Sequence, residues 1–201
     1  MKIAVVGATG MIGSRVVAEA AGRGHDVVAL SRKGQAVEGA AESRALDLND
    51  TAALATTIAD ADATVIAVSG ARSGGTDDEV FAAHRDLIAA APEGRVLVVG
   101  GAGSLEVDGV RLKDTPGFPD FILAEATTFS NVLDQYRASE GLDWTVLCPA
   151  PMIAPGERTG AYRVGGDSVI GDSISAENFA VALVDELETS AHRGARFTVA
   201  S

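Results

Sequence analysis

A glycine-rich segment near the start of the chain has the residue types and spacing that bind phosphate. It reads Gly7-Ala8-Thr9-Gly10-Met11-Ile12-Gly13 and lies between an apolar run and a segment with helical periodicity. In that setting the first glycine allows a tight turn, the second lets the backbone approach a pyrophosphate, and the third lets the helix pack closely. Amides at the helix start attract the phosphates. We therefore expect a dinucleotide to contact Gly7, Thr9, Gly10, Met11 and Ile12; a plain strand-to-helix turn is the alternative.

The end of the second apolar run bears on which nicotinamide cofactor is preferred. NAD enzymes commonly place an acidic residue there to accept hydrogen bonds from the ribose hydroxyls. Here the run ends with Leu30 and is followed by Ser31, Arg32 and Lys33. A hydroxyl and two cations suit a 2′-phosphate. The segment favours NADP(H) with NAD(H) as a second option, and a solvated basic turn is the alternative reading.

Residues after the other apolar runs are candidates for the rest of the site, because ligands of open α/β sheets lie beyond the carboxyl ends of the strands. The adenine is expected near Asp47 and Leu48. The ribose and pyrophosphate side is expected near Val68, Ser69, Gly70, Gly100 and Gly101. The nicotinamide is expected beside Cys148, Pro149 and Ala150. Ordinary turn glycines and a buried, inert Cys148 thiol are the alternatives.

The elements that must position these residues alternate along the chain. Short runs rich in Val, Ile and Leu occupy 3–6, 27–30, 64–68, 95–99 and 144–147, and helix-like segments occupy 11–21, 52–58, 77–91 and 124–139. Apolar runs without alternation are typical of parallel strands covered on both faces. A loop or small hairpin is expected over 157–167, a capped helix over 179–187 and a last strand over 196–199. The pattern predicts an α/β, three-layer Rossmann fold with a doubly wound, mostly parallel sheet, as a single domain over 1–201 with a small C-terminal elaboration on the substrate side.

Composition and missing motifs exclude several functions. The formal net charge is -12 with three lysines, which argues against a nucleic-acid partner. The chain has one cysteine and no long apolar run, and its first apolar strand-like run begins at Ile3. These features predict a cytoplasmic protein without a membrane span. No Gly-x-Ser-x-Gly elbow or phosphate loop with Gly-Lys occurs. No metal site is expected, and the isolated histidines are interpreted as a turn residue, His25, and two helix-surface residues, His84 and His192.

These residues together resemble an atypical short-chain dehydrogenase/reductase, within the group that includes NmrA-like proteins, biliverdin reductase B and NADH-flavin reductases. The resemblance covers essentially the whole chain. Besides the opening glycine motif, it rests on three more specific segments: Val98-Val99-Gly100-Gly101-Ala102-Gly103-Ser104-Leu105, Asp114-Thr115-Pro116-Gly117-Phe118-Pro119, and Pro155-Gly156-Glu157-Arg158-Thr159-Gly160 with Tyr162-Arg163.

The chain departs from the larger family in lacking its Tyr-x-x-x-Lys pair, in which lysine lowers the pKa of the catalytic tyrosine. Tyr136 is followed at that spacing by Glu140, and Tyr162 by Gly166. Carbonyl reduction by that mechanism is therefore not expected.

Hydride transfer from NADPH to FMN, FAD or a quinone-like planar acceptor needs no built-in acid and agrees with the resemblance. Ser104 is the candidate catalytic residue, expected to hydrogen-bond the acceptor or the nicotinamide, and a structural serine of the turn is the alternative. Phe118 and Phe121 are candidates for stacking on the acceptor, and core packing of at least one of them is the alternative. The alternatives are a non-catalytic NmrA-like redox sensor that binds a protein partner and, further off, a nucleotide-sugar epimerase. A monomer or homodimer is expected.

Overall fold

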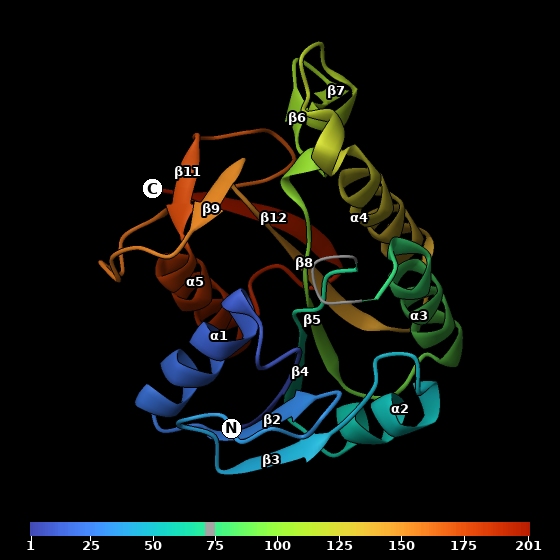
Figure 1. The fold of residues 1–201 in the computed structure, drawn as a ribbon, viewed down its shortest axis with the longest axis vertical. Helices are drawn as coiled ribbons and strands as arrows, with labels where there is room; N and C mark the ends of the chain where they lie inside the picture. Colours follow the sequence, from blue (N-terminus) through green and yellow to red (C-terminus); the bar gives the residue numbers. More distant parts are fainter. Residues whose placement is uncertain (71–74) are drawn as a thin grey trace.

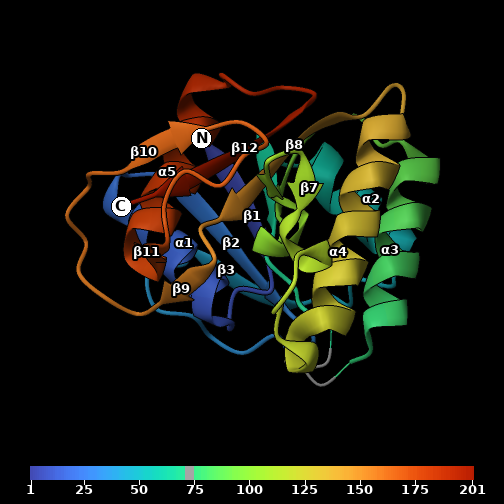
Figure 2. The same ribbon diagram turned by 90° about the horizontal axis from the view of Figure 1, so that it is seen from above.

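Helices cover both faces of one central sheet in the computed structural model, which describes residues 1–70 and 75–201. The eight strands run in the order β10-β12-β8-β5-β4-β1-β2-β3. Helices α1 and α5 cover one face, and α2, α3 and α4 cover the other (Figures 1 and 2). The strands of this sheet are β1 (Lys2–Val6), β2 (Asp26–Ser31), β3 (Glu42–Ala45), β4 (Ala63–Ile66), β5 (Arg95–Val99), β8 (Asp143–Pro149), β10 (Arg163–Gly165) and β12 (Ala195–Ala200). The helices are α1 (Met11–Gly22), α2 (Thr51–Ala59), α3 (Asp77–Ala90), α4 (Asp120–Ala138) and α5 (Ala176–Thr189).

The strands are apolar on both faces because each face has its own core. In β1 the side chains of Ile3 and Val5 pack in the core beneath α1 and α5, whereas Ala4 and Val6 pack in the core beneath α2 to α4. Successive strand residues point to opposite faces, so a strand covered twice cannot alternate with polar residues. Every pair in the sheet is parallel except β10 with β12. The predicted doubly wound, mostly parallel sheet is confirmed.

Helix boundaries follow local signals in the sequence. Gly24, just past α1, has φ +83°, a left-handed conformation that glycine adopts without strain. Thr76 and Glu79 form a reciprocal capping box at the start of α3, and the Ser175 hydroxyl accepts a hydrogen bond from the Asn178 amide at the start of α5. These caps fix where α3 and α5 leave the carboxyl edge of the sheet.

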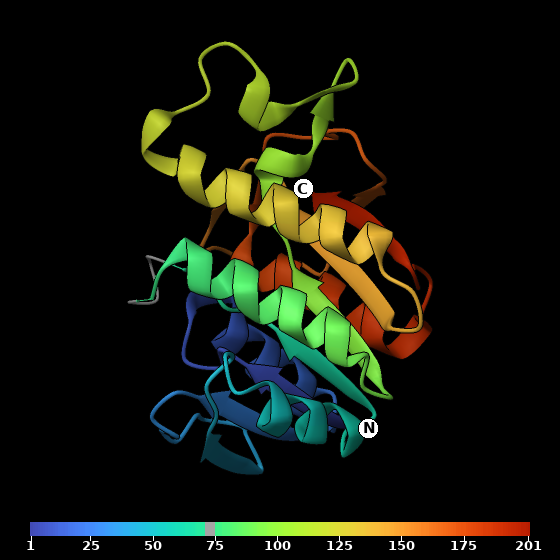
Figure 3. The same ribbon diagram turned by 90° about the vertical axis from the view of Figure 1, so that its right-hand side faces the viewer.

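Several elements differ from the sequence prediction. Strand β3 was not predicted, because its residues are polar and mostly exposed at the sheet edge. Helix α4 begins at Asp120 and not at residue 124, which places Phe121 in its first turn; Figure 3 shows α4, in yellow, beside α3, in green. The stretch 157–167 is no hairpin, since its second part is the edge strand β10. Two small pairs add to the fold: β6 (Glu106–Val107) with β7 (Val110–Arg111), and β9 (Met152–Ala154) with β11 (Ser173–Ser175). The 3-10 turns η2 (Ala102–Ser104) and η3 (Leu112–Asp114) flank the first of these pairs.

Two histidines do not lie on helix surfaces as predicted. His84 is fully buried between α3 and α4, where its Nδ1 lies 2.9 Å from the Tyr136 hydroxyl. His192 lies in the turn after α5, stacked on Phe197 with 4.0 Å between ring centroids, and its Nδ1 is 2.7 Å from a Glu186 carboxylate oxygen. His25 follows the turn at Arg23 and Gly24, in the short connection between α1 and β2.

The buried His84 makes stability sensitive to mild acid. Burial lowers the pKa of His84 from 6.5 to about 4, because the charged form would lose its hydration. In the unfolded chain His84 binds a proton below about pH 6.5, whereas in the folded chain it binds one only below about pH 4. The free energy of unfolding therefore falls as the pH drops from 6.5 to 4. We expect this group to remove about 3 kcal/mol in all, from 1.36 kcal/mol per pKa unit.

Urea unfolding at steps between pH 7 and pH 4.5 measures this effect. The double variant His84→Phe/Tyr136→Phe is the control, because it removes both hydrogen-bonding partners and leaves no buried hydroxyl unsatisfied. Its free energy of unfolding should fall less steeply over this range. Equal slopes for the parent and the double variant would contradict the prediction.

Candidate functional site

The glycine segment forms a tight loop against two neighbouring strands. Gly7 has φ +86°, and its amide and that of Ala8 both donate to the Leu30 carbonyl of β2, at 2.9 and 3.1 Å. A Cβ on Gly7 would lie 2.3 Å from the Ala67 carbonyl oxygen beyond β4. Only glycine fits this position, and the loop is held at the point where β1, β2 and β4 end.

Helix α1 starts from this loop without the usual stabilising side chains. Its N-cap is Gly10, no side chain accepts a hydrogen bond from the first turn, and no acidic residue lies there. By contrast, Asp50, Thr76 and Ser175 cap α2, α3 and α5, and α4 carries Asp120 in its first turn. The first amides of a helix have no acceptor inside it and carry its positive dipole end. The start of α1 is therefore suited to an anion from outside the chain.

Gly10 and Gly13 serve different purposes in this loop. Gly10 has φ -78° and ψ 170°, which any residue adopts, so backbone conformation does not require glycine there. A Cβ on Gly13 would lie 2.1 Å from the Gly7 carbonyl oxygen, so its absence lets the helix approach the loop. Gly13 is a packing glycine, whereas the missing side chain of Gly10 leaves its exposed position open to a ligand.

The end of β2 and the residues that follow it lie next to this loop. Ser31 is buried, and its hydroxyl accepts a hydrogen bond from the Gln35 amide at 3.3 Å, so it shapes the turn that carries the exposed Arg32 and Lys33. Asp47, after β3, is exposed and accepts hydrogen bonds from the backbone and side chain of Asn49. These bonds, and to a smaller extent the charge of Arg32, lower the pKa of Asp47. Arg32 and Asp47 therefore share one electrostatic environment.

Leu48 does not share that environment. Its side chain is buried in the core beneath α2 to α4. The side chain of Leu48 is therefore not exposed for contact with an adenine, and of the two residues only Asp47 stays a candidate for this contact.

Beyond β4, Val68, Ser69 and Gly70 continue the same edge of the sheet. Val68 and Ser69 are half-buried, and a Cβ on Gly70 would lie 2.2 Å from an Asp77 side-chain oxygen at the start of α3. Gly70 is thus required by the close approach of α3. The structure brings this segment beside the Gly7 loop, since the Val6 carbonyl accepts from the Ala67 amide at 2.8 Å.

The ends of β5 and β8 are packed tightly together. A Cβ on Gly100 would lie 2.7 Å from the Cys148 sulfur, and one on Gly101 would lie 3.1 Å from Phe129 Cβ. Cys148, Pro149 and Ala150 are buried, and burial raises the pKa of the Cys148 thiol. The structure thus supports the reading of Cys148 as a buried, inert thiol. Side chains of these three residues do not face an open site, and any contact from them would come from their backbone.

Ser104 does not have the geometry of a catalytic residue. Its side chain is 1% exposed, and its hydroxyl donates to the Gly101 carbonyl at 2.8 Å. The Cys148 sulfur lies 3.5 Å away on the other side. The burial and hydrogen bonding of Ser104 do not support the predicted contact with an acceptor or a nicotinamide; in this structure its hydroxyl stabilises the η2 turn.

Of the two candidate stacking residues, Phe121 is the more exposed. It is 87% exposed in the first turn of α4, while Phe118 is half-buried in the preceding loop. Sequence reasoning missed Met152, which is 69% exposed on β9 just beyond the end of β8. The local sequence around Met152 does not indicate that its side chain is exposed, because this exposure depends on how β9 pairs with β11.

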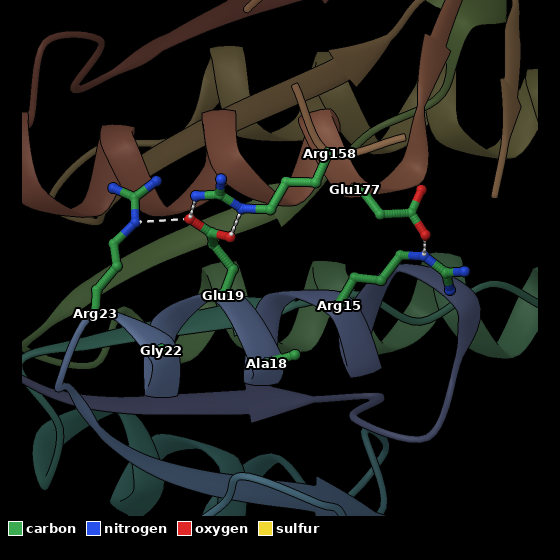
Figure 4. A pocket seen from close by; sticks show the side chains of 7 residues that line it. All are labelled: Arg15, Ala18, Glu19, Gly22, Arg23, Arg158 and Glu177. Atoms are coloured by element: carbon green, nitrogen blue, oxygen red, sulfur yellow. Dashed lines mark hydrogen bonds and ion pairs between the residues drawn. The ribbon is translucent and has the colours of Figure 1, made fainter. Parts of the chain in front are cut away.

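A further group of charged side chains lies on the α1–α5 face, beside the segment that connects β9 to β10. A hollow of about 390 Å³ there is lined by Arg15, Glu19, Arg23, Arg158 and Glu177, whose charges pair with one another (Figure 4). No group of three or more His, Cys, Asp or Glu residues suited to a metal ion occurs in residues 1–70 and 75–201. No helix in that part of the chain is long and apolar enough to cross a membrane.

The strand order, the tight glycine loop and the uncapped α1 define a Rossmann-type dinucleotide-binding protein. The model of the NAD(P)H-binding family matches residues 7–190, and the chain belongs to this family. It is 39% identical over 213 aligned residues to YwnB of Bacillus subtilis, an uncharacterized protein, with 100% of this chain and 99% of YwnB covered.

Solved structures with the same fold carry different provisional names. A Burkholderia pseudomallei protein provisionally named as exported is 41% identical, with a TM-score of 0.90 and 100% of both chains covered. A Bacteroides thetaiotaomicron protein provisionally named an epimerase is 32% identical, with a TM-score of 0.85, covering 98% of this chain and 95% of that one. A Streptococcus pneumoniae protein provisionally named an NADH-flavin reductase is also 32% identical, with a TM-score of 0.83 and coverages of 99% and 98%. The resemblance to NAD(P)H-binding Rossmann proteins of the atypical short-chain group is confirmed, and these names do not agree on one reaction.

Proposed function

We propose that this protein is an NADPH-dependent reductase that passes hydride to a flavin or a similar planar acceptor. The observation that carries the proposal is the start of α1, which has neither a capping side chain nor an acidic residue in its first turn. Its N-cap is the exposed Gly10, whose backbone conformation does not require glycine. When bound, NADPH supplies a hydride at its nicotinamide ring. The amides of Met11 and Ile12 would hold the pyrophosphate.

The two tyrosines support a mechanism without a tyrosine acid. Tyr136 is fully buried against His84, and burial raises its pKa. Tyr162 donates its hydroxyl to the Asp185 carboxylate, and its pKa is raised by burial and by that carboxylate. Neither phenol is prepared to release a proton, whereas an active tyrosine of the Tyr-x-x-x-Lys type needs a lowered pKa. A flavin accepts hydride directly and takes its remaining proton from water, so the chain need only orient it. Phe121 is the exposed aromatic ring that would stack on a planar acceptor.

The name of the Streptococcus pneumoniae neighbour agrees with this reaction, and that of the Bacteroides neighbour points to epimerisation. The tyrosine environments favour the first. The proposal includes a cytoplasmic location, where a free cysteine such as Cys148 stays reduced.

An assay of NADPH oxidation tests the proposal, with FMN, FAD and a set of quinones as added acceptors. The loss of NADPH absorbance measures the rate. We expect oxidation that depends on both protein and acceptor. If NADPH binds but no acceptor accelerates its oxidation, the enzyme assignment is wrong and a redox sensor that reports to a protein partner takes its place. A nucleotide-sugar that raises the melting temperature would instead favour an epimerase.

The proposal includes a preference for NADP(H), carried by Ser31, Arg32 and Lys33. Replacing Arg32 by alanine should raise the Kd for NADPH about tenfold or more, because a hydrogen bond to a charged group contributes roughly 1.5–3 kcal/mol. The Kd for NADH should change less than about twofold, since NADH has no 2′-phosphate for Arg32 to bind. Fluorescence titration of both cofactors measures the two constants.

Arg85→Ala is the matched control, because it removes the same charge from an exposed position on α3. It should leave both constants as in the parent. Equal loss of NADPH and NADH affinity in Arg32→Ala would show that Arg32 does not bind the 2′-phosphate.

A further inference from the structure

An exposed segment is held against the cofactor helix by a set of side-chain contacts. Residues 155–162, called the strap below, connect β9 to β10; residues 155–161 are exposed and Tyr162 is half-buried. The strap has no helix or strand hydrogen bonds of its own. Polar side chains of α1 and α5 hold it instead. Its polar residues Glu157, Arg158, Thr159 and Tyr162 all belong to the segment from Pro155 to Arg163 on which the family resemblance partly rests.

The contact from α1 is Glu19, whose side chain is nearly buried. Its carboxylate accepts hydrogen bonds from Arg158 Nε at 2.6 Å and from Arg158 Nη2 at 2.8 Å. Arg23 Nε donates to the same carboxylate at 2.8 Å. Figure 4 shows Glu19 rising from α1 between the two arginines. The hydrogen bond from Arg158 is the largest cause of the lowered pKa of Glu19. This paired, two-point contact fixes Arg158 in orientation as well as in position.

The contacts from α5 hold the backbone of the strap. Glu177 accepts from the Gly156 amide at 2.7 Å, and its other carboxylate oxygen accepts from Arg15 Nε of α1 at 2.6 Å. The buried Asn178 uses one side-chain oxygen to accept from the amides of Thr159 and Gly160, at 3.0 and 2.9 Å. A loop with three backbone amides tied to side chains is restrained even though its surface is open to water.

The strap begins near the edge of the sheet where ligands bind. It follows directly from β9 and the exposed Met152, just beyond the carboxyl end of β8, where ligands of such sheets lie. Its anchor Glu19 is on α1, and Arg15 of the same helix holds the anchor Glu177; the start of α1 would hold the pyrophosphate. The contacts therefore link a segment that starts at this edge of the sheet to the helix proposed to hold the pyrophosphate.

We propose that Glu19, Glu177 and Asn178 form a clip that holds the strap as the wall of the acceptor site, and that they are positioning residues for the reaction. The proposal rests on the reductase function proposed above. Because the clip touches neither cofactor nor acceptor, its loss should weaken acceptor binding without weakening the binding of NADPH.

Hydrogen exchange of the full chain, followed by mass spectrometry, tests the clip without any activity. We expect Glu19→Gln and, separately, Arg158→Ala to speed exchange at least about fivefold in peptides covering 155–162, because opening of the strap exposes its amides. Arg158→Ala guards against misfolding of Glu19→Gln, since Arg158 is more than half exposed. Glu188→Gln is the matched control: Glu188 pairs with Arg23 and His25 at the same α1–α5 seam and does not contact the strap. Unchanged exchange in both test variants would overturn the clip.

Steady-state kinetics with FMN as the acceptor then tests the role of the wall. In Glu19→Gln we expect the KM for FMN to rise at least fivefold, with the Kd for NADPH and kcat within about twofold of the parent, and Glu188→Gln to behave as the parent. Faster exchange with an unchanged KM for FMN would show that the strap does not form a wall of the acceptor site. If the parent chain reduces neither FMN nor any other acceptor, the reductase function fails, while the exchange data still decide whether the clip exists.

Discussion

Replacing Gly10 by aspartate will weaken NADPH binding by about 100-fold or more while leaving the fold intact. The aspartate side chain can accept hydrogen bonds from the first amides of α1, which is the usual role of an N-cap residue. It would then occupy the amides proposed to bind the pyrophosphate and place a negative charge beside it. The backbone of Gly10 already has an extended conformation that aspartate adopts. A 100-fold loss corresponds to about 2.7 kcal/mol of binding free energy.

Titration with NADPH and urea unfolding of the same samples separate binding from stability. The free energy of unfolding should stay within about 0.5 kcal/mol of the parent, because an aspartate cap exceeds glycine by only a few tenths. A Cβ at position 10 lies 3.2 Å from the Gly7 carbonyl oxygen, so Gly10→Ala shows the effect of the added carbon alone. If Gly10→Asp binds NADPH within threefold of Gly10→Ala, the start of α1 does not hold the pyrophosphate.

The features that sequence reasoning predicted are those whose causes lie within a few residues of each other. The strand, glycine loop and helix from Lys2 to Gly22 follow from apolar runs and glycine spacing, and the cap of α5 at Ser175 follows from local hydrogen bonding. His84 was misplaced although a signal was present. Val80, Ala83 and Leu87 are the other buried residues of α3, at spacings that put His84 on the same apolar face. The position of His84 on this helix face, and not its polar side chain, determines its burial.

The features that were missed depend on contacts between distant parts of the chain. Glu19 and Arg158 are 139 residues apart, so one sequence gives no sign that they pair. Ser104 was predicted to face a ligand because it lies just past the central strand, although a serine in a glycine-rich loop is more often structural. Its direction depends on the η2 turn, which points the hydroxyl inward to the Gly101 carbonyl. Local patterns thus predicted the cofactor side of the site better than the acceptor side, whose walls come from loops packed on other elements.

Gly13→Ala should lower the free energy of unfolding by about 3 kcal/mol, the upper end of the usual cost of overpacking. The added Cβ would lie 2.1 Å from the Gly7 carbonyl oxygen and 2.7 Å from its carbonyl carbon. Both are backbone atoms of a loop that is itself fixed by hydrogen bonds to Leu30, so neither can move away cheaply. The helix must shift instead, which would also displace the amides at its start and reduce NADPH affinity.

Gly22→Ala provides the matched control for this prediction, because it makes the same substitution in the same helix. Nothing lies within 4 Å of a Cβ at position 22, so the alanine should raise the free energy of unfolding by about 0.5 kcal/mol through helix propensity alone. Urea unfolding of both variants should therefore give effects of opposite sign. A cost for Gly13→Ala below about 1 kcal/mol would mean that the loop yields to the helix, and that close packing is not the reason for glycine at this position.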